Sequence, residues 1–214
     1  VGEVVNKGVD INLRGRVYQS RDWMVNVFAN LAHNKNEILK VAESLKAYNE
    51  RVNEYFRENM YNSTSLEPFT QYVEGGSLTS IYAMRSLGID PATGEELLLT
   101  KKGDITTVWN TNEQVIVGNK EPKAQGTLGF NVSFKGFSLY ATFLYEFGGQ
   151  RYNSTLAEKV ENVDVYNYNV DKRVLTKRWQ KPGDHTKFKA LQKSALYSLK
   201  TNPTERFVQD YNVL

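Results

Sequence analysis

The chain contains few residues whose type and spacing would support catalysis or metal binding. Its two histidines, His33 and His185, lie far apart, and neither stands at ligand spacing from another histidine. Cysteine is absent, which excludes disulfides, thiolate zinc sites and cysteine nucleophiles. We therefore predict no catalytic residue, no metal site and no cofactor.

Other patterns with a possible chemical role are incomplete. Acidic and amide residues between Asp164 and Asp171 have some likeness to a calcium-binding loop, but the EF-hand spacing and its terminal glutamate are missing. A surface loop rich in tyrosine and asparagine is the favoured interpretation. Gly75-Gly76-Ser77 lacks the lysine of a phosphate-binding loop. The chain has many acidic residues, but the sequence does not identify any two of them as the catalytic carboxylates of a glycosidase.

The side chains better suited to binding are aromatic residues outside the regular stretches. Such side chains can stack on sugars or hold peptides, and they serve equally well in ordinary loop packing. The candidates for contact with a substrate or with a lid protein are Tyr72, Tyr82, Trp109, Tyr166, Tyr168 and Trp179.

Two stretches with a period of two predict the β-hairpins that position these segments. Residues 126–147 form two alternating runs around a turn at Lys135-Gly136, and their shared apolar face is rich in aromatic side chains. Residues 8–32 alternate in the same way, with charged and amide side chains on the opposite face. A soluble sandwich would bury the aromatic face in its core. A transmembrane barrel would turn it towards lipid, with the polar face towards a wet lumen.

Two long excursions, residues 33–125 and 148–205, follow the hairpins. In the first, apolar residues at threes and fours predict a helix over about residues 37–59, with Asn36 as its N-cap. Weaker patterns predict a small hairpin across Lys101–Gly103, a helix from Val170 to Trp179 and a last strand from about Phe207. Short turns at one end and long loops at the other are typical of outer-membrane barrels, which favours the membrane interpretation.

The composition sets broad limits on the class of protein. The chain has 214 residues, of which 40% are hydrophobic and 24% charged, so it is long enough for a domain and is not disordered by composition. A formal net charge of +3, with both signs interspersed, gives no case for a nucleic-acid partner. The first residues do not have the pattern of a signal peptide, and both ends are expected to be internal to a longer chain.

Short motifs along nearly the whole chain resemble, in their order, the C-terminal part of the SusC/RagA-like TonB-dependent outer-membrane transporters of Bacteroidetes. Each motif alone is weak, and the ordered set is strong. The motifs are VNKGV at residues 5–9, DW at 22–23, NLAHNKN at 30–36, GIDPATG at 88–94, VGNKEPK at 117–123, FKGF at 134–137, RW at 178–179, KPGD at 181–184 and RFV at 206–208.

The resemblance implies a mainly β fold, in which antiparallel hairpins form part of a transmembrane β-barrel and the long extracellular loops contain one or more helices. It places residues 1–214 in a single barrel domain, with hairpins at about 8–32 and 126–147, long loops at about 33–125 and 148–205, and a helix at about 37–59. The plug domain of the family is absent from this sequence.

The function implied by the resemblance is active import across the bacterial outer membrane, with no enzymatic step. The family takes up oligosaccharides or peptides with a SusD-like surface lipoprotein and with energy from TonB. The expected partners are therefore that lipoprotein, TonB through the missing N-terminal part, a glycan or peptide substrate and outer-membrane lipid, without nucleic acid.

Two other classes of function remain open at this point. A soluble α+β carbohydrate-binding module would make the aromatic hairpin face a core. An enzyme would need a convergent acid–base site, which the sequence does not display.

Overall fold

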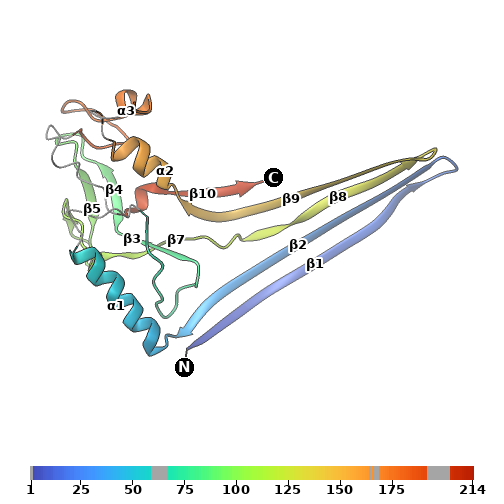
Figure 1. The fold of residues 1–214 in the computed structure, drawn as a ribbon, viewed down its shortest axis with the longest axis horizontal. Helices are drawn as coiled ribbons and strands as arrows, with labels where there is room; N and C mark the ends of the chain where they lie inside the picture. The colour runs from blue at the N-terminus through green and yellow to red at the C-terminus, as the bar shows by residue number, and fades with distance from the viewer. Residues whose placement is uncertain (1, 59–66, 164, 166–168, 192–202) are drawn as a thin grey trace.

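The long strands form one antiparallel sheet. The computed structural model describes residues 2–58, 67–163, 165, 169–191 and 203–214. The strand order of the sheet is β1-β2-β8-β9-β10, so that β2 is followed in space by a strand far along the chain. Its strands are β1 (Glu3–Gln19), β2 (Trp23–Lys40), β8 (Ala124–Phe134), β9 (Phe137–Tyr152) and β10 (Val208–Val213). Figure 1 shows this sheet extending away from all other elements, which gather at one end of it.

Tight turns join β1 to β2 and β8 to β9 at the free end of the sheet. Lys135 and Gly136 both have a positive φ, of 44° and 88°, which is the backbone of a two-residue turn whose twist matches the flanking strands. The predicted turn at these residues is confirmed. The other turn lies beside it, because the backbone N–H of Lys135 donates to the carbonyl of Asp22 at 3.2 Å.

At the opposite end, the segments after β2 and after β9 fold together into what we call the loop unit (the described parts of residues 41–123 and 153–207). It contains α1 (Glu43–Glu58), a pair formed by β3 (Ser80–Ala83) and β7 (Val115–Asn119), and a sheet of β4 (Arg85–Ile89), β5 (Glu96–Leu99) and β6 (Ile105–Thr106). Its short helical segments are η1 (Thr111–Glu113), α2 (Ser154–Leu156), the π-helical η2 (Ala157–Glu161), α3 (Arg173–Thr176) and η3 (Glu205–Phe207).

The buried hydrophobic clusters lie in the loop unit. The first joins α1 to the small sheets and consists of Val52, Phe56, Met84, Leu98 and Trp109. The second joins the segments after β9 and consists of Ala157, Val160, Val174, Phe188 and Phe207. Many large apolar side chains of the long sheet are instead exposed, as Phe137 at 80% and Leu139 at 61% show. The hairpin face is therefore not the core that a soluble module would require.

Helix α1 begins later than the sequence pattern indicates, and the predicted N-cap at Asn36 is wrong. Asn36 lies in β2, where its side-chain amide donates to Asn6 Oδ1 at 2.7 Å and its Oδ1 accepts from the backbone of Leu78 at 2.9 Å. Ile38 and Val41 are spaced like residues of a helix. Both side chains are buried, but at the end of β2 rather than on a helix. There the N–H of Ile38 donates to the carbonyl of Gly76 at 2.8 Å.

The smaller predicted elements are present in part. β5 and β6 form the predicted hairpin across Lys101–Gly103. The helix predicted within residues 170–179 is limited to α3, because Arg178 forms a bridge with Phe188 and the backbone N–H of Trp179 donates to the carbonyl of Phe188 at 3.0 Å. In the part of the chain that the structure describes, no helix combines the length and the apolar character needed to cross a bilayer.

Candidate functional site

Strands β1, β2, β8 and β9 keep their alternation in register, which gives the sheet one apolar and one polar face. Residues paired across strands point to the same face, and a slip of one residue would mix the two. One apolar row consists of Leu13, Ala29, Leu128 and Phe143. A polar row on the other face consists of Arg16, Asn26, Asn131 and Tyr140. The same alternation continues along most of the sheet, so each face is continuous over several strands.

Aromatic side chains stand at both ends of the apolar face. Near the turns, the rings of Trp23 and Phe134 lie 4.3 Å apart between centroids. Towards the loop unit, the rings of Tyr145 and Phe147 lie 5.6 Å apart, and the Tyr145 hydroxyl donates to the carbonyl of Asn30 at 2.8 Å. An apolar band between two aromatic borders is the pattern of a β-sheet that faces lipid.

The polar face has the hydrogen-bonding groups expected of a surface in contact with water. The Asn30 side-chain oxygen accepts from the hydroxyl of Thr127 at 2.8 Å. Nearer the turns, Phe28 and Tyr140 stack with centroids 5.7 Å apart. They line a shallow hollow of about 630 Å³ that also has two arginines on its wall, Arg14 and Arg16. This face combines cations, amides and one aromatic pair.

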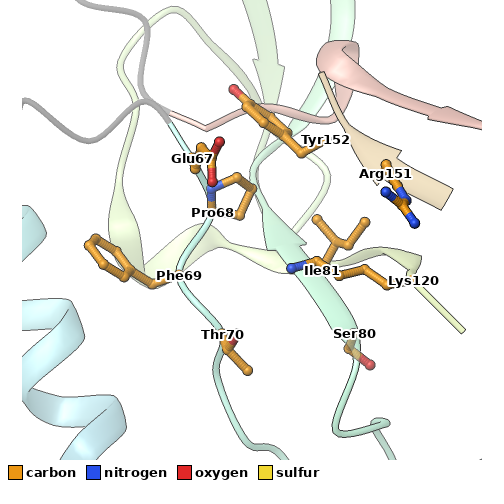
Figure 2. Close-up of a pocket in the computed structure, with 9 residues that line it drawn as sticks. All are labelled: Glu67, Pro68, Phe69, Thr70, Ser80, Ile81, Lys120, Arg151 and Tyr152. Carbon is orange, nitrogen blue, oxygen red and sulfur yellow. The ribbon is translucent and has the colours of Figure 1, made fainter. Parts of the chain in front are cut away.

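A pocket of about 280 Å³ lies where the loop unit meets the end of β9. Figure 2 shows that Lys120 and Arg151 stand on one side of it, opposite Glu67 and Phe69. The complete lining consists of Glu67, Pro68, Phe69, Thr70, Ser80, Ile81, Lys120, Arg151 and Tyr152. The pocket thus presents two cations next to an apolar wall.

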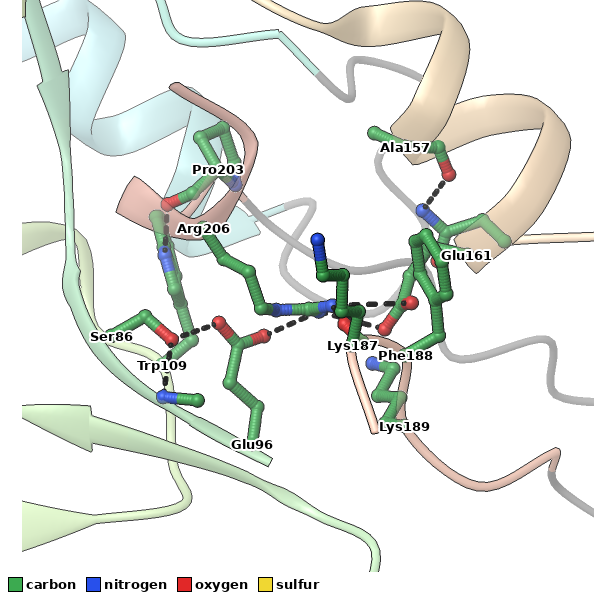
Figure 3. A network of polar contacts seen from close by, with 12 residues as sticks. Ser86, Glu96, Trp109, Ala157, Glu161, Lys187, Phe188, Lys189, Pro203 and Arg206 are labelled. Atoms are coloured by element: carbon green, nitrogen blue, oxygen red, sulfur yellow. Dashed lines mark hydrogen bonds and ion pairs between the residues drawn. The ribbon is translucent and has the colours of Figure 1, made fainter. Parts of the chain in front are cut away.

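A buried ion-pair network holds the loop unit together (Figure 3). The Arg206 guanidinium donates to Glu96 Oε2 at 3.0 Å and to Glu161 Oε1 at 2.8 Å, and these carboxylates are 7% and 0% exposed. The Ser86 hydroxyl donates to the second oxygen of Glu96 at 2.7 Å, and the carbonyl of Lys187 accepts from Arg206 at 2.6 Å. One arginine therefore links β5, η2 and the segment that leads into β10.

The charges in this network keep one another ionised. Burial acts to raise the pKa of Glu96, but the charge of Arg206 and the hydrogen bonds from Arg206 and Ser86 outweigh it and hold the pKa below its usual range. For Arg206, burial acts to lower the pKa, while the two carboxylates raise it above its usual value. The same burial lowers the pKa of the neighbouring Lys189. At neutral pH the Glu96–Arg206 pair is therefore fully charged.

A second contact between the two excursions is built around Gly94. The Trp179 ring lies directly over Gly94, and its indole N–H donates to the carbonyl of Pro91 at 2.9 Å. The backbone N–H of Ala190 donates to the carbonyl of Gly94, also at 2.9 Å. Gly94 has a φ of +75°, and a Cβ there would lie 2.5 Å from the Trp179 ring. Only glycine satisfies both the backbone and the close approach of the ring.

Gly94→Ala is therefore expected to weaken the loop unit more than an alanine at another glycine with positive φ. Gly103 is the matched control, because its φ is +94° but no atom lies within 4 Å of its would-be Cβ. Backbone strain of about 1 kcal/mol applies to both, and the clash with Trp179 applies to Gly94 alone. Limited proteolysis would compare the two variants. Equal cleavage rates would contradict the role of the Trp179 contact.

The structure places the aromatic residues singled out in the sequence at several different positions. Tyr82 and Trp109 are buried, at 3% and 8% exposure, and the Trp109 indole donates to the carbonyl of Pro203 at 3.0 Å. Tyr72 and Trp179 are half-buried. None of these four residues lines the pocket of Figure 2. Tyr166 and Tyr168 lie outside the described residues. Contact of these six residues with a substrate or a lid protein stays a prediction.

Sequence reasoning did not single out the side chains that the structure brings together. Glu96 and Arg206 are 110 residues apart in the chain, and no local spacing connects them. Lys120 and Arg151 are closer in sequence, but Lys120 follows β7, Arg151 lies in β9, and no local spacing connects them either. The available signals were the motifs at residues 117–123 and 206–208, which contain Lys120 and Arg206.

The chain is similar to known proteins in sequence and in fold, among them a sequence relative and two solved structures. No family model matches the chain. It is 26% identical over 171 residues to the TonB-dependent receptor P3 of Formosa agariphila, an alignment that covers 74% of this chain and 16% of the receptor. Two structures of RagAB, one described as a peptide transporter and one as a peptide importer in the closed-closed state, match with TM-scores of 0.70 and 0.67 and identities of 22% and 21%.

The structural matches cover nearly all of this chain but only a small part of the solved chains. Each structural match covers 99% of this chain and 22% of the solved chain, so the chain spans less than a quarter of the length of the proteins it matches. The mainly β, antiparallel fold and the likeness to TonB-dependent receptors are as predicted from the motifs. In sequence and in fold, the chain is similar to a segment of the SusC/RagA-like TonB-dependent receptors of the bacterial outer membrane.

Proposed function

We propose that the chain forms part of the barrel wall and the extracellular loops of an outer-membrane importer of nutrients. The observation that carries this proposal is the long single-layer sheet with one apolar and one polar exposed face. An apolar band bordered by aromatic rings suits lipid, and a face of arginine, asparagine and tyrosine suits a water-filled lumen. The similarity to a TonB-dependent receptor and to RagAB supports the same reading.

The finer parts of the proposal concern the substrate and the partners. We infer that the complete receptor imports oligosaccharides or peptides too large for porins, that TonB supplies the energy through a part outside this chain, and that a SusD-like lipoprotein covers the loop unit. The RagAB structures are of a peptide transporter, which supports a peptide substrate. The chain itself is assigned no catalytic step.

Uptake by cells tests this proposal. In the native host, deletion of the complete gene is expected to abolish uptake of a labelled peptide mixture or oligosaccharide mixture, and deletion of TonB should have the same effect. The receptor extracted from outer membranes should migrate differently on gels before and after boiling, as closed barrels do. Unchanged uptake in both deletion strains, or recovery of the native product in the soluble fraction, would contradict import through this protein.

A further inference from the structure

We propose that the pocket between the loop unit and the end of β9 binds a carboxylate group of the imported substrate. This inference rests on the proposed function and adds to it the chemical class of a contact site. The pocket is built from four separate segments, namely residues 67–70, β3, the residue that follows β7, and the last two residues of β9. It therefore exists only when the loop unit is folded against the barrel strands.

The charge of the pocket favours an anion. Lys120 and Arg151 line the same side (Figure 2), and no ion pair involves either side chain among the residues that the structure describes. Arg151 is held in place because its guanidinium lies 3.6 Å from the centre of the Tyr211 ring. The backbone of Lys120 is fixed beside β3 by a hydrogen bond of 3.0 Å to the carbonyl of Thr79. Against these two cations, the lining contains one acid, Glu67.

The remaining walls select the kind of anion. Ser80 Oγ accepts from the backbone N–H of Ser77 at 2.8 Å, which holds this side chain against its own loop. Phe69 contributes apolar surface opposite the two cations, and Ile81 contributes it beside Lys120. A volume of about 280 Å³ lies just below the range of ~300–1,000 Å³ typical of whole-ligand sites. The site therefore fits one end of a longer molecule, consisting of a carboxylate on a short, partly apolar stem.

Two nutrient classes offer this chemistry, the C-terminus of a peptide and the acid group of a uronic sugar. The carboxylate is the shared feature, and the pair of cations is the shared means of recognition. Because the pocket lies at the loop end of β9 rather than along the polar face, the carboxylate would be held at the mouth of the barrel. The rest of the substrate would extend into the space beyond.

The test uses the complete receptor, purified in detergent, and isothermal titration calorimetry. The probes are N-acetylated tetra-alanine with a free C-terminus, its C-terminal amide, tri-galacturonate and a neutral galactose trimer. The double variant Lys120→Gln with Arg151→Gln removes both cations. The control, Lys101→Gln with Lys102→Gln, makes the same charge change in the exposed turn between β5 and β6. Arg151→Lys alone keeps the charge, and heat-modifiable gel mobility confirms that each variant is folded.

For the nutrient class that the receptor imports, the probe with a free carboxylate is expected to bind at least about tenfold more tightly than its neutral counterpart. One charge-assisted hydrogen bond is worth about that factor. The double variant should lose this preference, while the control and Arg151→Lys retain it. Whether the peptide or the galacturonate shows the preference identifies the source of the carboxylate. Equal binding of acid and neutral probes, no binding of either acid, or an unchanged preference in the double variant would overturn the inference. TonB-dependent uptake measured in parallel separates this failure from failure of the proposed import function.

Discussion

Arg206→Ala is expected to destabilise the loop unit by about 3–5 kcal/mol, because it leaves buried carboxylates without their cation. Glu96 and Glu161 are 7% and 0% exposed and both accept from this guanidinium, so neither can regain water without opening the structure. Hydrogen exchange of the complete receptor, followed by mass spectrometry, would measure the effect. Peptides that contain β5 and η3 should exchange about 10²–10⁴ times faster, which is the same free energy expressed as a rate.

The matched control for this variant is Arg173→Ala. Arg173 also forms an ion pair, with Asp171 at 2.8 Å, but the side chains are 49% and 33% exposed. Hydrogen bonds from the Arg173 side chain and backbone hold the pKa of Asp171 at about 2, and water screens the pair, so its loss should leave exchange in β5 and η3 nearly unchanged. Similar acceleration in both variants would show that the Arg206 network contributes no more than a surface pair.

Acidification should change the stability of the loop unit in opposite directions in the wild type and in Arg206→Ala. In the wild type, the folded pKa of Glu96 is below its usual value, so the stabilisation is complete above the unfolded pKa of ~4.3 and is lost as the pH falls through the folded pKa. Without Arg206, burial is the dominant influence and raises the folded pKa of Glu96. Acidification towards pH 4 should then increase the protection of the variant, measured relative to the slower intrinsic exchange of free amides in acid, and a further loss of protection would contradict the pairing.

Phe143→Arg is expected to reduce folding of the complete receptor into membranes, at a cost of about 2–4 kcal/mol, the range for arginine at the bilayer midplane on a lipid-facing strand. Phe143 belongs to the apolar row with Leu13, Ala29 and Leu128. It stands between the aromatic borders, with Phe137 on one side and Phe147 on the other. The folded fraction in lipid vesicles, read from heat-modifiable gel mobility against urea concentration, would give the free energy.

Thr142→Arg is the adjacent control on the opposite face. Thr142 pairs with Gly129 on the polar side of the sheet and is exposed, so an arginine there would meet water in the proposed lumen. The expected change in stability is much smaller than for Phe143→Arg. If Thr142→Arg were the more damaging of the two substitutions, the assignment of lipid and lumen to the two faces would be reversed.

The hairpins could be predicted from the sequence because their information is local. Alternation in residues 126–147 and a turn at Lys135-Gly136 determine which side chains share a face, and the observed register preserves those faces across four strands. The start of α1 could not be read in this way. Ile38 and Val41 have helical spacing, yet Ile38 is buried through backbone pairing with Gly76, a contact that no periodicity reveals.

For the candidate site, the residue types could likewise be read from the sequence, but the contacts between distant segments could not. The aromatic residues of the excursions can be recognised from the sequence. Their residue type alone does not show whether a ring binds a ligand or packs inside the protein. Trp109 is buried against Pro203 and Phe56 because segments that are distant in sequence meet there. Likewise, Lys120 and Arg151 line one pocket only after β7 and β9 come together. Such a site depends on tertiary contacts that one sequence does not disclose.

The Glu96–Arg206 pair has a consequence for the order in which the protein matures. Its two members are 110 residues apart, and the contacts of Met84 and Trp109 with Pro203 join residues at similar separations in the sequence. Loop closure over such separations is slow, because its entropic cost precedes the gain from the contact. The first excursion therefore cannot complete its contacts, and Glu96 stays hydrated, until the segment before β10 has been synthesised. Completion of the loop unit is expected to be a late step of folding, after the strands on either side of it have paired.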